Sequence, residues 1–199
     1  MNPVWVPLDK PAWQQIKKES EIIEQDGHGV KVLRCQNGDY IKVFRIKHKI
    51  SMARLLNPAL RFSRNAERLH KLGIDTLTPL AFYHLAYANR WAVRYKPLEG
   101  ETLRGLIKQN ALPEKVVADL GAYIVQLHSK GIYFRSLHPG NVVLQPNGKL
   151  GLIDVLDCSF RWFGRPLNAW QRKRNLRHFF RYDDGKTIEK ELLAAINCM

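Results

Sequence analysis

The chain has few cysteines, and they form no recognisable pattern. The three, Cys35, Cys158 and Cys198, are an odd number and include no C-x-x-C pair. Disulfide frameworks and zinc knuckles both need paired, regularly spaced cysteines, so neither is indicated. We expect reduced thiols with structural roles.

Long apolar runs are also missing. No stretch approaches the ~18 uninterrupted apolar residues that a membrane-spanning helix needs. The first residues contain Asp9, Lys10 and three prolines by position 11, where a secretory signal would have an apolar core. These absences predict a cytoplasmic location.

Acidic residues are scarce relative to basic ones. The 199 residues contain 32 Lys and Arg against 18 Asp and Glu, a formal net charge of +14. Such an excess favours a polyanionic partner, which could be nucleic acid, an anionic membrane face or a phosphorylated glycolipid. Charge alone does not choose among them. The 45% of hydrophobic residues is typical of a globular chain of one domain or two coupled lobes.

The first half of the chain predicts a small, mainly β lobe over residues 1–97. Alternating apolar residues and turn signals predict an antiparallel meander over 20–47, a basic irregular segment over 48–58, a helix over 59–72, and strands at Ala81–Tyr87 and Arg90–Tyr95.

The remainder, residues 98–199, predicts a mainly helical lobe that contains one hairpin. An amphipathic helix is expected over 113–130 with Pro113 at its first position, the hairpin strands at Val142–Leu144 and Leu150–Val155, and basic helices at 170–182 and 187–197.

Asn141 and Asp154 flank this hairpin and are the strongest candidates for a metal site. They are 154 − 141 = 13 residues apart, and the hairpin between them can bring both to one side of a cleft. Two oxygen ligands, completed by phosphate oxygens and water, suit Mg²⁺. The alternative is structural: a capped turn at Asn141 and a strand-end Asp154.

Lys42 and Glu67 are a second candidate pair. Period-two alternation in the strand Tyr40–Phe44 puts Lys42 on one face with two aromatic rings. Its ammonium would hold nucleotide phosphates, or it would be an edge-strand lysine that discourages aggregation. Glu67, on the next helix, would orient Lys42, or it would pair with Lys71 on the helix surface.

Two glycines, Gly27 and Gly29, lie in the first predicted turn. Glycines allow backbone N–H groups to approach an anion, so this turn is a weak candidate for covering phosphates. The alternative is a plain hairpin turn.

Arginines are concentrated near the C-terminus. Those predicted to bind a polyanion or an anionic acceptor are Arg161, Arg165, Arg172, Arg174 and Arg177. Trp162, Phe163, Trp170 and Phe179 are interspersed with them. The alternative is a solvated helix face whose aromatic residues pack inward.

Together these motifs resemble a known family. Leu137-His138-Pro139-Gly140-Asn141 and Gly151-Leu152-Ile153-Asp154 look like the catalytic core of kinase-like phosphotransferases, and residues 20–182 resemble the Kdo/WaaP-type lipopolysaccharide kinases most. The resemblance implies a two-lobed α+β kinase-like fold with a truncated C-terminal lobe. It also implies that Lys42 and Glu67 handle ATP phosphates, that residues 95–99, including Tyr95 and Leu98, lie beside adenine, and that Asn141 and Asp154 hold magnesium.

One residue departs from the kinase pattern in an important way. That pattern places its metal-binding Asn five residues after the catalytic Asp, and here 141 − 136 = 5 with Ser136 at the Asp position. Phe134 also replaces the usual histidine, and Val155-Leu156 replace Phe-Gly. Ser136 and Asp154 are therefore the predicted catalytic positions, and Asp157 is a candidate substitute carboxylate whose alternative role is structural.

We therefore expect an ATP- and Mg²⁺-dependent phosphotransferase that acts on a sugar hydroxyl of a phosphorylated glycolipid or another polyanionic acceptor. The resemblance places it in the cytoplasm, peripherally at the inner membrane of a Gram-negative cell. The alternative is a pseudokinase that acts as a binding or scaffold protein in envelope biogenesis. A nucleic-acid-binding module is a weaker alternative, because no binding motif accompanies the charge.

Overall fold

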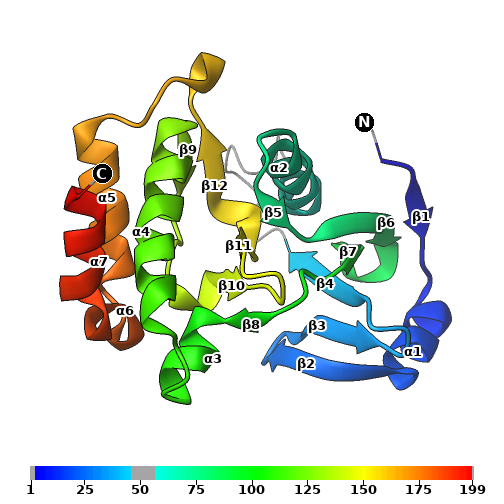
Figure 1. Cartoon of the computed structure of the whole chain (residues 1–199). Helices are drawn as coiled ribbons and strands as arrows, with labels where there is room; N and C mark the ends of the chain where they lie inside the picture. Colours follow the sequence, from blue (N-terminus) through cyan, green and yellow to red (C-terminus); the bar gives the residue numbers. More distant parts are fainter. Residues whose placement is uncertain (1–2, 46–56, 199) are drawn as a thin grey trace. The chain divides into compact units, whose positions relative to one another are not determined.

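The computed structural model describes residues 3–45 and 57–198 (Figure 1). The fold is mixed α+β, as expected. It divides into two compact units: the first contains the described residues up to Arg68 together with Leu77–Pro97, and the second contains Leu69–Thr76 and the described residues from Leu98 onward. The three cysteines are free thiols.

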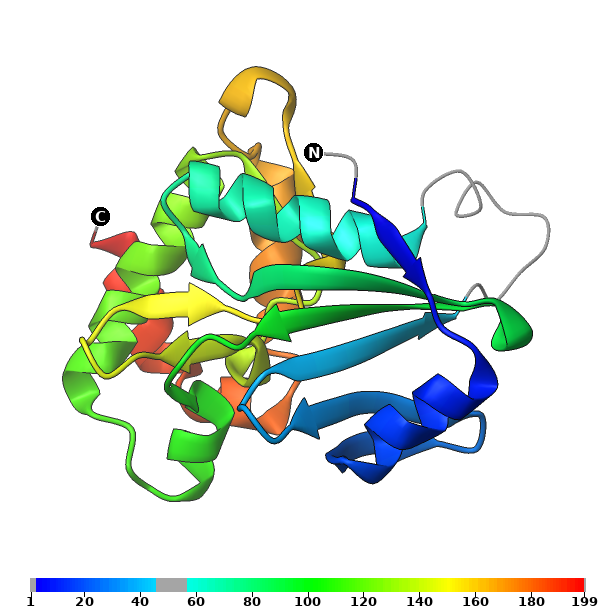
Figure 2. The ribbon, with the colours of Figure 1, turned by 90° about the vertical axis from the view of Figure 1, so that its right-hand side faces the viewer.

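The first unit is built on a six-stranded sheet. Its strands, in spatial order, are β1 (Trp5–Pro7), β6 (Thr78–Leu85), β7 (Arg90–Lys96), β4 (Tyr40–Arg45), β3 (Gly29–Cys35) and β2 (Ser20–Asp26). All neighbours are antiparallel except β1 and β6. Figure 2 shows these strands side by side. The predicted meander is confirmed, and the predicted basic segment at 48–58 falls almost entirely outside the described residues.

Two N-terminal elements were missed by the sequence reading. Strand β1 adds to the sheet edge beside β6, and helix α1 (Lys10–Lys18) follows it with Asp9 as its N-cap. The helix buries Trp13 against the apolar face of the sheet, with Leu33, Ile41 and Leu85 among its neighbours. One large ring thus anchors a short helix that has little apolar surface of its own.

Helix α2 (Pro58–Lys71) agrees with the predicted helix to within one residue at each end. The next strand was placed too late along the chain, because β6 begins at Thr78 and ends at Leu85. A 3₁₀ turn, η2 (Ala86–Ala88), then leads to Asn89, whose left-handed backbone (φ 49°) reverses the chain into β7.

The second unit combines helices with two small sheets. Its helices are α3 (Leu103–Lys108), α4 (Glu114–Ser129), α5 (Ala169–Phe179), α6 (Asp183–Thr187) and α7 (Glu189–Asn197). One sheet has the order β5 (Asp75–Thr76), β11 (Leu150–Leu152), β10 (Val142–Leu144), β8 (Glu101–Thr102), and the other pairs β9 (Ile132–Phe134) with β12 (Cys158–Phe160). Figure 1 shows α7 alongside α4 in this unit.

Several predicted boundaries change in this unit. Pro113 is the N-cap of α4 and not its first helical residue. Helix α5 starts after a capping box between Asn168 and Gln171 and ends at Phe179, earlier than the predicted end at 182. The short helix α6 lies between the two predicted basic helices. Strand β10 has the predicted bounds and pairs with β11 in the register Val142↔Leu152, but β11 ends at Leu152. The 3₁₀ turn η4 (Val155–Asp157) replaces the predicted end of that strand.

Candidate functional site

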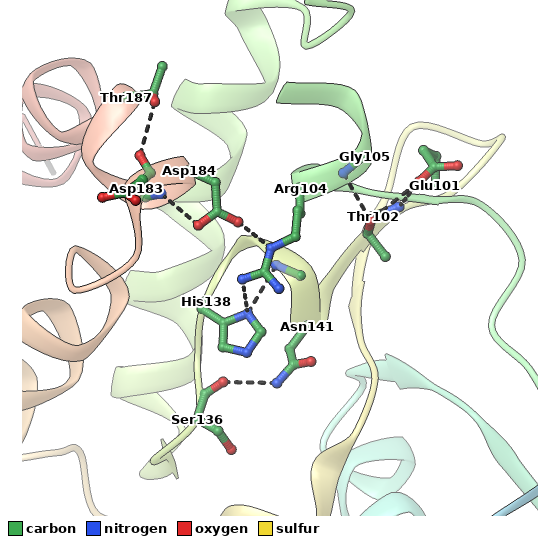
Figure 3. A network of polar contacts seen from close by, with 12 residues as sticks. Glu101, Thr102, Arg104, Gly105, Ser136, His138, Asn141, Asp183, Asp184 and Thr187 are labelled. Carbon is green, nitrogen blue, oxygen red and sulfur yellow. Dashed lines mark hydrogen bonds and ion pairs between the residues drawn. The ribbon is translucent and has the colours of Figure 1, made fainter. Parts of the chain in front are cut away.

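The loop after β9 is closed by the side chain of Asn141. This residue ends the 3₁₀ turn η3 (Pro139–Asn141) and is 8% exposed. Its Nδ2 donates to the backbone carbonyl of Ser136 at 3.0 Å (Figure 3). A carbonyl oxygen only accepts, so this bond fixes the amide orientation and turns Oδ1 to the other side. The buried amide thus offers an oxygen ligand in a defined direction.

Asp154 is brought next to Asn141 by the hairpin between β10 and β11. Beyond the last paired strand residues, the N–H of Ile153 donates to the carbonyl of Asn141 at 3.0 Å. Asp154 then adopts a left-handed backbone with φ 52° before η4 begins. Aspartate adopts this conformation more readily than most non-glycine residues. Strand β11 ends at Leu152, so Asp154 lies in the turn beyond the strand.

Asp157 lies beside Ser136. Pairing of β9 with β12 aligns Phe134 with Cys158, and the N–H of Arg135 donates to the Asp157 carbonyl at 3.4 Å. The Ser136 hydroxyl donates to Asp157 Oδ2 at 3.3 Å, while Arg135 Nη2 lies 3.2 Å from Oδ1. The carboxylate that the sequence suggested as a substitute therefore contacts the serine that replaces the kinase aspartate.

A second network holds the loop from its other side (Figure 3). Arg104, on α3, forms an ion pair through Nε with Asp184 on α6, and its Nη2 lies 3.3 Å from His138 Nδ1. The Gly140 N–H donates to the same His138 nitrogen at 3.1 Å. A Cβ at Gly140 would lie 2.8 Å from Arg104 Cζ, so the guanidinium packs directly against the loop backbone.

These contacts define the protonation of His138. Two donors point at Nδ1, so this nitrogen accepts and the neutral ring carries its proton on Nε2. Burial, followed by the charge of Arg104, lowers the pKa of His138 from 6.5 to about 4. The ring also packs against Tyr182, with centroids 4.6 Å apart. His138 is therefore a neutral part of the support of the loop.

Asn175 supports the start of the same loop from helix α5. Its Nδ2 donates to the Phe134 carbonyl at 2.6 Å, and its Oδ1 lies 2.9 Å from His128 Nε2. Burial lowers the pKa of His128. Neither Arg104 nor Asn175 was singled out from the sequence, because nothing in their local sequence marks them as partners of a loop 30 to 40 residues away.

A basic cavity of about 960 Å³ opens next to Ser136 and Asp157. It is lined by Tyr133, Arg135, Ser136, Asp157, Lys173, Arg174, Leu176, Arg177, His178, Phe180, Arg181, Lys186, Glu189 and Leu193. Six Lys or Arg side chains face only two carboxylates there. We call this space the basic cavity; its charge favours an anionic ligand.

The five predicted polyanion-binding arginines separate into two groups. Arg174 and Arg177 line the basic cavity. Arg161 Nη1 donates to the Pro166 carbonyl at 2.8 Å, and Arg172 Nε donates to the Leu167 carbonyl at 2.9 Å, so these two support the loop before α5. Arg165 is an exposed residue of that same loop.

The alternative for these arginines, a solvated helix face whose aromatic residues pack inward, is only partly correct. Phe179 is fully buried, but Trp162, Phe163 and Trp170 are 82%, 91% and 63% exposed. Their exposure leaves an apolar surface among the arginines.

In the first unit, Lys42 lies on β4, an interior strand of the sheet. Strands β7 and β3 flank it on both sides, so the edge-strand alternative is wrong. The ammonium lies 5.7 Å from the centre of the Phe62 ring. Tyr95 contacts the same ring edge-on and stacks on Tyr40. Lys42 is thus a half-buried cation near aromatic rings on an interior strand.

The other predicted nucleotide residues have structural contacts of their own. Glu67 is half-buried on α2. Leu98, in the second unit, packs against Gly151 of β11.

Gly27 and Gly29 lie in the β2–β3 turn, where Gly29 has φ 113°. The N–H of His28 between them donates to Asp26 Oδ1 at 2.8 Å, and this bond lowers the pKa of Asp26. Arg90 Nη2 donates to the His28 carbonyl. The turn is thus closed by side chains, and one of its N–H groups is already used.

No group of three or more His, Cys, Asp or Glu residues suited to a metal occurs in the described part of the chain. The metal prediction therefore depends on Asn141 and Asp154. Within the same residues, no helix is both long and apolar enough to span a membrane.

A kinase-like fold, with an amide before a short hairpin and a carboxylate after it, defines the class, a kinase-like phosphotransferase. The sequence model of the lipopolysaccharide kinase (Kdo/WaaP) family matches residues 41–193, more than half of the chain. The chain belongs to this family, which confirms the resemblance. Membership supports a phosphotransferase of the lipopolysaccharide kinase type that uses ATP. A search of curated proteins finds no match.

Proposed function

We propose that this protein transfers a phosphoryl group from ATP, with Mg²⁺, to a sugar hydroxyl of a phosphorylated glycolipid of the lipopolysaccharide core. The observation that supports this proposal is the hydrogen bond from the Ile153 N–H to the Asn141 carbonyl, which ties together the two ends of the hairpin, where Asn141 and Asp154 lie. An oriented amide oxygen and a neighbouring carboxylate are the hard ligands that Mg²⁺ prefers.

Asn141 and Asp154 would hold the metal. Bound Mg²⁺ supplies charge that neutralises phosphate oxygens, which is the main requirement of phosphoryl transfer. In this proposal the chain orients those ligands through the Ser136 carbonyl and the Ile153 N–H. Lys42, Glu67, Tyr95, Leu98 and the Gly27/Gly29 turn are the proposed nucleotide contacts, of which Lys42 has the most supportive surroundings.

The basic cavity is the proposed acceptor site. Its six cations would bind the phosphates or carboxylates of a glycolipid headgroup, and Ser136 would face the bound sugar. Arginine pairs with such groups through two parallel hydrogen bonds, and four of the six cations are arginines.

Asp157 would accept the proton of the attacking hydroxyl. Ser136 cannot act as a base at neutral pH, but it already donates to Asp157 Oδ2. An acceptor hydroxyl that enters beside Ser136 would meet the same carboxylate oxygen. The O–H bond of the acceptor breaks, its proton moves to Asp157, and its oxygen forms the new bond to phosphorus as the bond between the phosphoryl group and ADP breaks.

The second candidate function is a pseudokinase with a binding or scaffold role in envelope biogenesis. The observation that favours it is Ser136 at the position of the catalytic aspartate. General-base catalysis contributes typically ~10²–10⁴-fold, so its loss slows a kinase strongly without removing its nucleotide site. Under both functions we propose a cytoplasmic location at the inner membrane.

A binding experiment and a turnover experiment separate these functions. ATP with Mg²⁺ should raise the melting temperature of the wild type, because a ligand that binds the folded state stabilises it. Asp154→Asn should abolish most of that shift, whereas the control Asp119→Asn, on α4, should retain it. Transfer of labelled phosphate to a lipopolysaccharide core acceptor then tests catalysis. A shift without transfer would favour the pseudokinase, and the absence of both would refute the nucleotide site.

A further inference from the structure

The loop between β12 and α5 presents two adjacent aromatic rings to solvent. Among the large apolar side chains that the structure describes, Phe163 is the most exposed, at 91%, and Trp162 is 82% exposed. We call residues 161–168 the aromatic loop. Figures 1 and 2 both show it extending past the neighbouring end of α4, within the second unit.

The aromatic loop is firmly anchored at both ends. The Arg161 N–H donates to the Gly131 carbonyl at 2.9 Å, and the N–H of buried Leu167 donates to the His128 carbonyl at 2.8 Å. Across the loop, Arg161 Nη1 binds the Pro166 carbonyl. A Cβ at Gly131 would overlap the Arg165 carbonyl, so the base of the loop is closely packed. The exposed rings therefore sit on an ordered support.

One of these rings belongs to a residue with a strained backbone. Phe163 has φ 55°, a left-handed conformation that aromatic residues rarely adopt. Glycine at position 163 would remove both the strain and the exposed ring. A strained and exposed aromatic residue of this kind points to a binding role for the ring.

The surroundings of the rings are cationic. From Cys158 to Tyr182 the chain contains seven Lys or Arg residues and no Asp or Glu. Arg165, Lys173 and Arg174 are exposed, and Arg174 lies over the exposed ring of Trp170, 5.1 Å from its centre. Protruding aromatic rings in a basic stretch of chain suit the boundary of an anionic bilayer, where rings enter the headgroup layer and arginines meet lipid phosphates.

We infer that the aromatic loop is a membrane-docking element, which inserts Trp162 and Phe163 into the interfacial layer of an anionic phospholipid bilayer. A projecting tip can enter a fluid lipid surface directly. Binding to a second copy of this chain would require a complementary pocket for the tip on that copy. Helix α5 follows the loop, and its Arg174 and Arg177 line the basic cavity, so docking would also bring that cavity to the membrane. Only the use of the cavity as an acceptor site at the membrane rests on the proposed function.

Vesicle binding tests the inference without nucleotide or acceptor. The wild-type protein should co-sediment with vesicles rich in phosphatidylglycerol, bind pure phosphatidylcholine weakly, and lose binding as salt rises. Trp162→Ala/Phe163→Ala should weaken binding about a hundredfold, roughly tenfold for each buried ring. The control Ile22→Ala/Ile23→Ala removes two exposed apolar residues from β2 in the first unit and should bind as the wild type does.

Fluorescence quenching by brominated lipids identifies the inserted residue. Quenching should occur in the wild type and fall in Trp162→Phe, which keeps an aromatic ring and should keep most of the binding. Equal vesicle binding by the wild type and the double alanine variant would overturn the inference, as would an absence of binding to anionic vesicles. A change from dimer to monomer in the double variant, without vesicle binding, would instead assign the loop to self-association. Normal transfer to a water-soluble acceptor by that variant would show that the proposed function survives.

Discussion

The Asp157→Asn variant tests whether the carboxylate of Asp157 acts as the catalytic base or has only a structural role. The replacement keeps the size of the side chain and one acceptor oxygen, and it removes the negative charge. Among the contacts of Asp157, it weakens the ion pair with Arg135 at 3.2 Å, between side chains that are 64% and 29% exposed, and the 3.3 Å hydrogen bond from Ser136. An exposed ion pair stabilises a protein by only about 0–1 kcal/mol.

The structural cost of this variant should therefore be small. Together the two contacts predict a loss of about 1 kcal/mol in the free energy of unfolding. For a chain of this size that corresponds to a decrease of roughly 2–4 °C in the melting temperature. If Asp157 is the base, kcat should fall by about 10²–10⁴-fold, or roughly 3–5 kcal/mol in the activation barrier. The catalytic effect would exceed the structural one several-fold.

The assay is the initial rate of phosphate transfer to a lipopolysaccharide core acceptor, from which kcat is obtained for the wild type and for Asp157→Asn. Arg135→Gln is the matched control, because it breaks the same ion pair and leaves the carboxylate in place. It should destabilise the protein similarly. Because Arg135 also lines the basic cavity, it should raise the KM for the acceptor and reduce kcat only a few-fold.

A rescue variant completes the test. Ser136→Asp, added to Asp157→Asn, restores a carboxylate at the kinase position and should recover part of the lost rate. If Asp157→Asn keeps kcat within about threefold of the wild type, which is far below the usual contribution of a general base, Asp157 has a structural role.

Three further predictions concern the residues that support the loop after β9 and the aromatic loop. Each is measured by urea unfolding followed by circular dichroism. Arg104→Ala should lower the free energy of unfolding by about 3 kcal/mol, because it leaves Asp184, 10% exposed, without its ion-pair partner; a loss below about 1 kcal/mol would contradict this. Lowering the pH from 7.5 to 5.0 should destabilise the wild type by about 1 kcal/mol more than it destabilises His138→Asn. The pKa of His138 is 6.5 in the unfolded chain and about 4 in the folded protein, so stability is lost as the pH falls between these values; the full effect would be roughly 2 kcal/mol, and the partial exposure of the ring reduces it. Equal pH dependence of the two proteins would argue against a neutral His138. Gly131→Ala should lower the free energy of unfolding by at least about 1–3 kcal/mol, because Gly131 has φ 69° and a Cβ there would meet the Arg165 carbonyl. The same variant should weaken vesicle binding. Unchanged stability would refute the close packing under the aromatic loop.

The elements that the sequence predicted well are those with local causes. The β10–β11 hairpin follows from apolar residues on both sides of Pro146-Asn147-Gly148, and α4 follows from apolar residues at helical spacing. Asn141 and Asp154 lie at the two ends of this hairpin along the chain. That they lie near each other in space could therefore be inferred before any fold was known. Helix α1 escaped prediction because a single ring, Trp13, accounts for most of its burial.

By itself, the sequence determined the motif chemistry, the family resemblance, the excess of positive charge and the periodicity of the main elements, because each depends on residues close together in the chain. Only the tertiary structure decided that Lys42 lies on an interior strand, that Asp157 contacts Ser136, that Arg104 supports the loop, and which arginines line the basic cavity. Those facts depend on which strands pair and which helix faces are buried. Strand order and helix packing are set by contacts between residues tens of positions apart, which no local pattern encodes.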